Sequence, residues 1–135
     1  MISRRLKLNP NFAPLPSEPG EEFFANGIFE FNVSKMLSFI KAHPDIFPKE
    51  TVALRDIPAI VTDGSDEATI ARADLDNPVI LAEISPGQFN LIDGHHRLAR
   101  ARREGRAAIP AYRIGPEHHT AFLTAKTSYE SYVTY

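Results

Sequence analysis

The prolines constrain this chain more than any other feature, because a helix or a central strand cannot run through them. The 135 residues include 11 prolines, and Pro10, Pro14, Pro16 and Pro19 fall close together. Proline lacks the backbone N–H that helices and sheet interiors use, so this density excludes a helix and most strands. We therefore expect residues 1–25 to form a proline-rich N-terminal arm that lies along the domain or a partner, and residues 26–135 to form a single domain.

After the arm, hydrophobic periodicity predicts a strand followed directly by a helix. Residues 28–32 alternate apolar and polar side chains, as a half-buried strand does. Asn32 or Ser34 can cap the helix that follows, and Pro44 stops it. Its apolar face consists of Val33, Met36, Leu37 and Ile40. We expect this face to pack on sheet residues such as Ile80, Ile84, Leu91 and Ile109.

The middle of the chain gives weaker signals. Three prolines interrupt residues 44–76, and the apolar stretches at 52–54 and 57–61 are short, so we expect two brief strands or one interrupted strand. Residues 62–65 are typical of a turn, and residues 66–75 predict a short helix or a loop.

The last third gives clearer signals. Residues 78–83 and 89–92 predict a hairpin with a loop of three to five residues. A helix over residues 94–104 follows, with Gly105 as its left-handed C-terminal cap. Residues 109–114 predict a strand, and Pro116 opens a last helix. The apolar face of that helix consists of Phe122, Ala125, Tyr129 and Tyr132. This order of elements predicts an α+β fold, a small mixed β-sheet with packed helices.

Composition excludes several classes of function. The chain has no cysteine, which excludes disulfides, thiol catalysis and cysteine-ligated zinc. Fifteen basic and 17 acidic side chains give a net charge of −2, so no global attraction to nucleic acid or anionic lipid exists. No apolar run is long enough to span a membrane, and the first residues lack the apolar core of a signal peptide. We expect a cytoplasmic protein with no membrane partner.

The segment Asp93-Gly94-His95-His96-Arg97 carries most of the chemistry. A buried strand is predicted to end there and to turn directly into a helix, whose first N–H groups carry partial positive charge. Gly94 permits close approach of a ligand to the backbone, Arg97 offers a fork for phosphate oxygens, and the histidines can donate or exchange protons. A structural alternative has equal weight: Asp93 caps the helix, Gly94 serves a tight turn and the arginines form a solvated face.

Two other groups of residues favour structural roles. The adjacent pairs His95-His96 and His118-His119 could suggest a metal, but neighbouring helical side chains diverge by about 100°, so we predict no metal site. The tyrosines at the C-terminal end are interpreted as packing or as a contact of a homodimer. They are Tyr129, Tyr132 and Tyr135.

Residues 78–110 resemble the core of the ParB N-terminal / sulfiredoxin-like superfamily. The shared pattern is a hairpin, an Asp-Gly-His-x-Arg turn, an arginine-rich helix, a glycine and a strand that begins Ile-Pro. In that superfamily the corresponding turn holds the phosphates of a nucleotide. The resemblance implies a ParB/sulfiredoxin-like fold, nucleotide binding by Gly94, His95, His96 and Arg97, and Mg²⁺ as a companion of the nucleotide.

The chain also departs from this superfamily. His95 stands where sulfiredoxins have their reactive cysteine, which excludes repair of sulfinic acids. No helix-turn-helix domain is found, so we expect no sequence-specific nucleic acid partner. The free-serine kinase branch uses an upstream acidic residue as a base, for which Glu30 is the candidate. Asp93 and His96 are the other candidate catalytic residues, because they lie within the turn itself.

These observations predict a stand-alone domain that binds a nucleotide or another phosphorylated small molecule. Transfer of a phosphoryl group or hydrolysis of a nucleotide is the reaction expected of it. One alternative is a non-catalytic protein-interaction module that retains the fold. A second is a ParB-like nuclease, which the acidic net charge disfavours.

Overall fold

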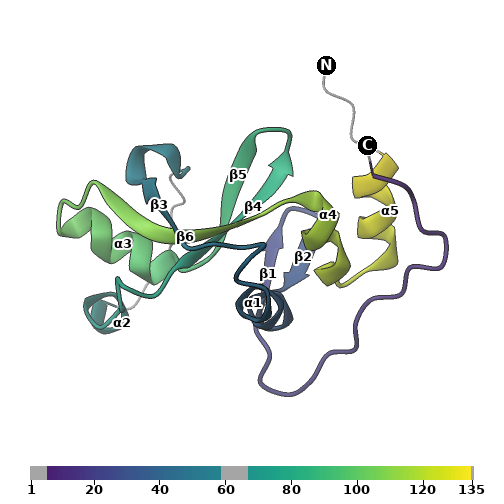
Figure 1. The fold of residues 1–135 in the computed structure, drawn as a ribbon. Coiled ribbons are helices and arrows are strands. Elements are labelled where there is room, and N and C mark those ends of the chain that lie inside the picture. The colour runs from purple at the N-terminus through teal and green to yellow at the C-terminus, as the bar shows by residue number, and fades with distance from the viewer. Residues whose placement is uncertain (1–5, 59–66, 135) are drawn as a thin grey trace.

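The computed structural model describes residues 6–58 and 67–134, which form an α+β fold (Figure 1). A four-stranded sheet has the order β3-β6-β4-β5, and β1 and β2 form a separate two-stranded sheet. The four strands of the larger sheet are β3 (Glu50–Ala53), β4 (Val79–Ser85), β5 (Gln88–Asp93) and β6 (Ala108–Ile114). Only β4 and β6 run parallel, so the sheet is mixed, as predicted.

The predicted hairpin is present, with a tighter turn than expected. Strands β4 and β5 pair antiparallel up to Ser85 and Gln88, which leaves only two residues between them. The second of these is Gly87, whose φ of 76° lies in the left-handed region that favours glycine. The expected loop of three to five residues was therefore too long.

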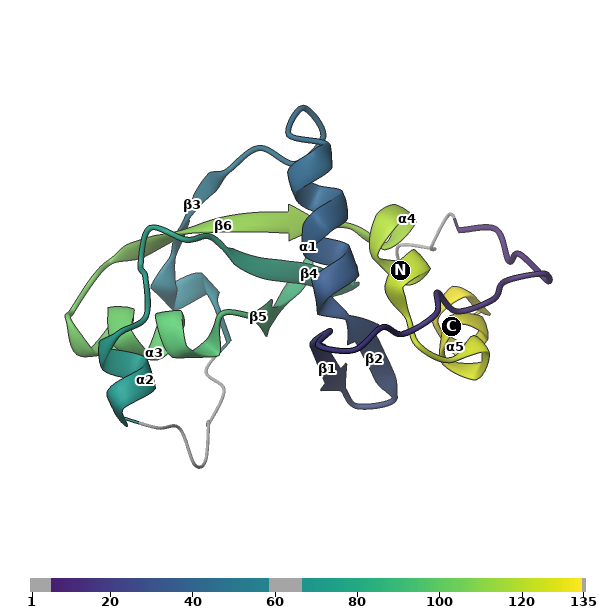
Figure 2. The same ribbon diagram turned by 90° about the horizontal axis from the view of Figure 1, so that it is seen from below.

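Two layers of helices cover the two faces of the larger sheet. Figure 2 shows α1 (Val33–Ala42) lying across one face, with α3 (His95–Arg103) and α2 (Glu67–Ala71) at one end of the molecule. The buried residues accordingly form two clusters. Ile80 belongs to the α1 side, whereas Leu91 and Ile109 belong to the α3 side. The expected packing is found on the α1 side for Ile80, Ile84 and Ile92, the neighbour of Leu91. Leu91 and Ile109 face the other side, because successive residues of a strand alternate between faces.

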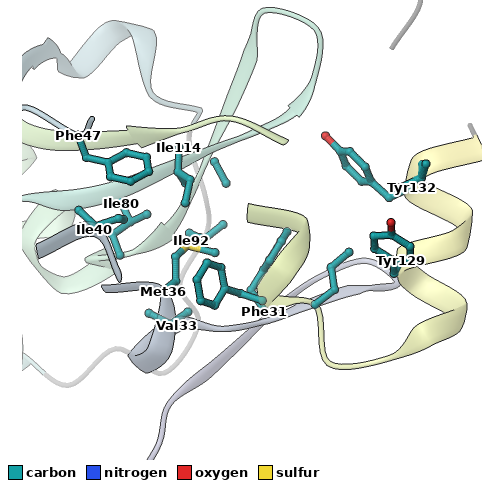
Figure 3. Close-up of a cluster of buried hydrophobic side chains, with 14 residues drawn as sticks. Phe31, Val33, Met36, Ile40, Phe47, Ile80, Ile92, Ile114, Tyr129 and Tyr132 are labelled. Atoms are coloured by element: carbon teal, nitrogen blue, oxygen red, sulfur yellow. The ribbon is translucent and has the colours of Figure 1, made fainter. Parts of the chain in front are cut away.

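Helix α1 begins and ends where the sequence predicts. The side chain of Asn32 accepts a hydrogen bond from Lys35 N at 3.0 Å, which makes Asn32 the N-cap. The helix stops at Ala42, two residues before Pro44. Three residues of its predicted face are buried, and Leu37 is partly buried against the same cluster. Figure 3 shows Val33, Met36 and Ile40 gathered with Ile80 and Ile92 in this core.

The predicted strand before α1 has a partner that the sequence did not reveal. It is β2 (Phe29–Asn32), and it pairs antiparallel with β1 (Phe23–Asn26). Strand β1 spans the predicted boundary between the arm and the domain. Residues 6–22 contain no helix or strand, as their prolines predict. Part of this arm lies along the domain, where Phe12 stacks on Tyr129 with ring centroids 4.0 Å apart.

The single helix expected from Pro116 onward is wrong. The chain forms α4 (Pro116–His119), a 3₁₀ turn (Thr120–Phe122) and, after a break, α5 (Lys126–Thr134). The break has a clear cause, because Leu123 leaves the helical conformation and bridges to Phe31 of β2. Thr124 N then donates to Glu30 O at 2.9 Å. Tyr129 and Tyr132 are buried in the core, which confirms their packing role.

The prediction of short strands, a turn and a short helix between α1 and β4 is confirmed in part. One brief strand, β3, is present and is followed by a 3₁₀ turn (Leu54–Asp56). Most of the second expected strand, at 57–61, and the turn at 62–65 lie outside the described residues. The helix expected within 66–75 is α2. Across the described ranges, no helix is long and apolar enough to cross a membrane.

Candidate functional site

Helix α3 starts without a side-chain cap. Its N-cap is Gly94, whose φ of 106° is left-handed, and no side chain accepts a hydrogen bond from the first turn there. Asp93 does not cap the helix as the structural alternative supposed; its carboxylate instead accepts from Arg97 Nη2 at 3.2 Å. The first helical bond runs from Leu98 N to Gly94 O at 2.9 Å. The N–H groups of residues 95–97 therefore have no carbonyl partner within the helix.

Gly94 is required by packing as well as by its backbone angle. A Cβ built on this residue would lie 2.4 Å from Val79 Cγ1. Any side chain would therefore push α3 away from β4. Together with the left-handed φ, this contact fixes a glycine at the point where the strand turns into the helix.

A pocket of about 340 Å³ opens at this turn, and we call it the α3 pocket. It is bounded by the start of β1, the start of α1, the end of β5 and the first turn of α3. Its lining residues are Glu22, Phe23, Phe24, Val33, Ile92, Asp93, Gly94, His95, His96 and Arg97. Five of the predicted site residues, 93–97, are thus brought together. Glu30 is not among the lining residues.

His95 forms the inner part of the pocket. Its imidazole packs against the Phe24 ring with centroids 4.9 Å apart. Its Nε2 atom is buried and has no hydrogen-bond partner among the residues that the structure describes. Burial lowers the pKa of His95 below its ordinary value, an effect that Asp93 opposes and His96 adds to. Burial therefore favours the neutral form of the His95 imidazole, whereas the side chain of the neighbouring His96 is exposed to solvent.

Arg97 is already engaged by the protein. Its Nη1 donates to the carbonyl oxygens of Asn77 at 2.9 Å and Pro78 at 2.5 Å, and its Nη2 donates to Asp93. The guanidinium thus fastens the segment before β4 to the first turn of α3. Its charge contributes to the α3 pocket, but its fork is directed mainly at protein oxygens.

The other arginines of this region also hold protein groups and do not form a free basic surface. Three of them bind backbone oxygens or carboxylates on neighbouring segments: Arg100 binds Ala73 O and Glu104, Arg102 binds Ile57 O, and Arg103 binds both carboxylate oxygens of Glu67. Arg106 pairs with Glu104 at 3.3 Å. Arg102, Arg103 and Arg106 are exposed, as expected of a solvated face. The contacts with Ile57, Glu67 and Ala73 were missed because these partners are distant in sequence.

Glu30 lies elsewhere and has a structural partner. Its carboxylate accepts a hydrogen bond from Thr124 Oγ1 at 2.8 Å, and its carbonyl accepts from Thr124 N. The side chain and the backbone of Glu30 therefore both hold Thr124, which precedes α5, against β2. The position of Glu30 in the first strand matched a family pattern, but its side chain does not reach the residues of the turn.

Sequence reasoning missed the wall of the pocket that β1 supplies. Glu22, Phe23 and Phe24 lie about 70 residues from the turn in sequence, and only the fold brings them together. A side-chain bond between Asn26 and Asn90 at 3.3 Å links β1 to β5 beyond the pocket. The adjacent phenylalanines just after the prolines were the one available signal.

The histidine pairs do not gather into a metal site. Within the described ranges, no three His, Cys, Asp or Glu side chains lie close enough to hold a metal ion. His119 is fully buried, and its Nε2 lies 2.6 Å from Glu83 O, which also accepts from the Tyr132 hydroxyl at 2.8 Å. His118 packs on Phe39 and Phe47.

A comparison with models of known protein families finds no match, and a comparison with curated proteins finds none. The resemblance to the ParB N-terminal / sulfiredoxin-like superfamily therefore stays a prediction.

Proposed function

We propose that the chain binds a phosphorylated small molecule, and specifically a nucleotide, in the α3 pocket. The observation that carries this proposal is the uncapped start of α3, where a left-handed glycine precedes three N–H groups that no carbonyl of the helix satisfies. Such a turn provides hydrogen-bond donors and a positive dipole end for an anion. We also propose a ParB/sulfiredoxin-like fold for the chain, because in that superfamily a similar turn holds the phosphates of a nucleotide.

The size and lining of the α3 pocket favour more than a lone phosphate. Its volume of about 340 Å³ falls within the range of roughly 300–1,000 Å³ that is typical of small-molecule sites. His96 is exposed beside the free N–H groups and is available to donate to a phosphate oxygen. The charge of Arg97 adds positive potential, while its fork stays on Asn77, Pro78 and Asp93.

The lining residues fit Mg²⁺ only together with a phosphorylated ligand. Asp93 and Glu22 are the two carboxylates of the pocket, and the described residues hold no cluster of three ligands. Mg²⁺ commonly binds through one or two carboxylates plus substrate phosphates and water. Asp93 and Glu22 would hold it in this way, and the ion would supply neutralisation of phosphate charge.

Phosphoryl transfer or nucleotide hydrolysis is the reaction that we propose for the site. Such a reaction needs a group that orients the nucleophile and accepts its proton. Asp93 and His96 line the same pocket as the free N–H groups, which supports these two candidates. Glu30 is directed at Thr124, so the role of proton acceptor is assigned here to Asp93 or His96.

The two alternative functions receive less support. A nuclease needs a basic surface for the nucleic acid backbone, and the arginines of α3 are bound to protein groups. A non-catalytic interaction module would leave the uncapped turn and its pocket without a role. Binding of a ligand without turnover would favour a binding module over an enzyme.

A thermal-shift screen tests the proposal directly. Nucleoside mono-, di- and triphosphates are added to the full chain with and without Mg²⁺, because a ligand that binds only the folded state raises the melting temperature. Calorimetry then measures affinity for the native chain and for His96→Ala, which removes an exposed donor and leaves the core intact. The expected loss is about tenfold to hundredfold for a hydrogen bond to a charged group.

The matched control is Lys49→Ala, an exposed residue that does not line the α3 pocket, and its affinity should equal that of the native chain. If no phosphate compound raises the melting temperature, the proposal is wrong. If one does and His96→Ala and Lys49→Ala bind it equally well, the proposed contact between the His96 side chain and the ligand is wrong.

A further inference from the structure

A short part of the proline-rich arm is held on α5 by specific contacts. Asn9 N donates to the Tyr129 hydroxyl at 2.9 Å, and Lys126 Nζ donates to Pro10 O at 3.1 Å. Phe12 stacks face to face on Tyr129, with an angle of 4° between the rings. The docked residues form a turn, because Phe12 N also donates a hydrogen bond to Asn9 O at 3.1 Å. Residues 9–12 thus occupy a surface of their own chain that Lys126 and Tyr129 of α5 provide, and we call it the Tyr129 surface.

The residues that follow this docked segment do not contact the rest of the molecule through polar bonds. None of the hydrogen bonds and ion pairs found in the described part of the chain involves residues 13–17, and Leu15 is 44% exposed. Figure 1 shows this stretch as a wide arc that leaves α5 and returns to β1. Pro14 and Pro16 lie in it, and prolines favour a stiff, extended chain over a bend.

The arm is anchored again immediately before the α3 pocket. Lys35 pairs with Glu18 at 3.2 Å and with Glu21 at 2.9 Å. A hydrogen bond from Glu18 N, followed by the Lys35 contact, lowers the pKa of Glu21 below its ordinary value, so the pair stays charged. Glu22 O then accepts from Val33 N at 2.9 Å. Residues 18–22 are therefore fixed to α1, independently of residues 9–12.

From these observations we infer that residues 6–12 exchange between two copies of this chain, so that each copy's segment binds the Tyr129 surface of the other. The contacts made across the two copies are the same as those made within one chain, and the arc at residues 13–17 is the hinge. Exchange of an identical segment is a low-cost route to a dimer, and Pro14 and Pro16 favour an extended hinge that reaches away from its own chain. The α3 pocket keeps its own β1 wall in both forms.

A paramagnetic label tests this exchange. The chain has no cysteine, so Asn11→Cys gives one labelling site on an exposed residue beside Phe12. Chain carrying the spin label is mixed with isotope-labelled chain that lacks it, and NMR records the signals of the latter. Exchange is expected to broaden the signals of α5, and the broadening should grow as total protein rises from about 0.1 to 1 mM, the range set by the effective concentration of a short linker.

Three controls make the outcome decisive. The same spin label in a dilute, isotope-labelled single chain must broaden α5, which shows that the label reaches it from within one copy. A label at Ile46→Cys, an exposed site after α1, should leave α5 of the other copy sharp. Phe12→Ala in the spin-labelled copy should remove the broadening. If α5 stays sharp in every mixture although the dilute single chain is broadened, residues 6–12 bind only their own chain and the inference is wrong.

Discussion

A Cβ on Gly94 would lie 2.4 Å from Val79 Cγ1, so the turn into α3 and the start of β4 are in direct contact. We predict that Gly94→Ala destabilises the fold by about 2–4 kcal/mol, from overpacking and a left-handed backbone angle together. Gly87→Ala is the matched control, because Gly87 also has a positive φ but no atom within 4 Å of an added Cβ. Urea unfolding should show a clearly larger loss for Gly94→Ala, and equal losses would contradict the contact.

Arg97 is expected to stabilise the fold through its two carbonyl partners and Asp93. Arg97→Ala should lower the free energy of unfolding by about 1–3 kcal/mol, because the partly buried acceptors Pro78 O and Asp93 lose a charged donor. Arg97→Lys should recover little, because an ammonium cannot reproduce the planar fork. Arg106→Ala, which breaks one exposed pair, should cost less than about 1 kcal/mol. A stable Arg97→Ala protein in a denaturant titration would show that its contacts add nothing.

Truncation of two neighbouring apolar residues of α1, Met36 and Leu37, should lower the free energy of unfolding by different amounts. Met36 is fully buried and Leu37 only partly, although both belong to the predicted apolar face. Met36→Ala should destabilise by about 2–5 kcal/mol, the range of truncations that leave a cavity, and Leu37→Ala by less. Chemical denaturation of both variants measures this difference. A larger loss of stability for Leu37→Ala than for Met36→Ala would mean that Leu37, and not Met36, is the more deeply buried residue of α1.

His95 is expected to make stability depend on pH. Its pKa in the folded state is lowered from the ordinary 6.5, chiefly by burial, so the unfolded chain binds a proton more readily. The free energy of unfolding should therefore fall as pH decreases below about 6.5. NMR titration should show the pKa of His95 rising toward 6.5 in Phe24→Ala, which uncovers the ring. An unchanged pKa in that variant would mean that Phe24 does not shield the imidazole.

Local features of the sequence predicted α1, β2 and the turn into α3, because their signals lie within a few residues. Asn32 caps α1 through the N–H three residues ahead, and Gly105 has the left-handed φ of 69° that a helix end favours. The prediction of one continuous last helix was wrong because of a tertiary contact. Leu123 bridges to Phe31, a contact 92 positions away that no periodicity in residues 116–132 can reveal.

The candidate site was predictable on one side only. Residues 93–97 form a contiguous motif, and the structure places all five on one pocket. The opposite wall comes from β1, a strand that was not predicted because prolines lie close to it in the sequence. Glu30 was chosen by its position in a strand, and its partner Thr124 was not known from the sequence. The topology of the chain decides which side chains meet across the fold. A short sequence motif carries no information about that topology.

The contacts of Arg97, Arg100 and Arg102 have a consequence for how this sequence tolerates change. All three bind carbonyl oxygens, at residue 57 and within residues 73–78, and every amino acid offers such an oxygen. The path of those segments is thus set by side chains that belong to α3. Residues at the accepting positions are free to vary wherever the backbone path is kept, whereas the donating guanidinium groups have no substitute. Diversity accumulated by mutation would then concentrate in the loops and spare the helix.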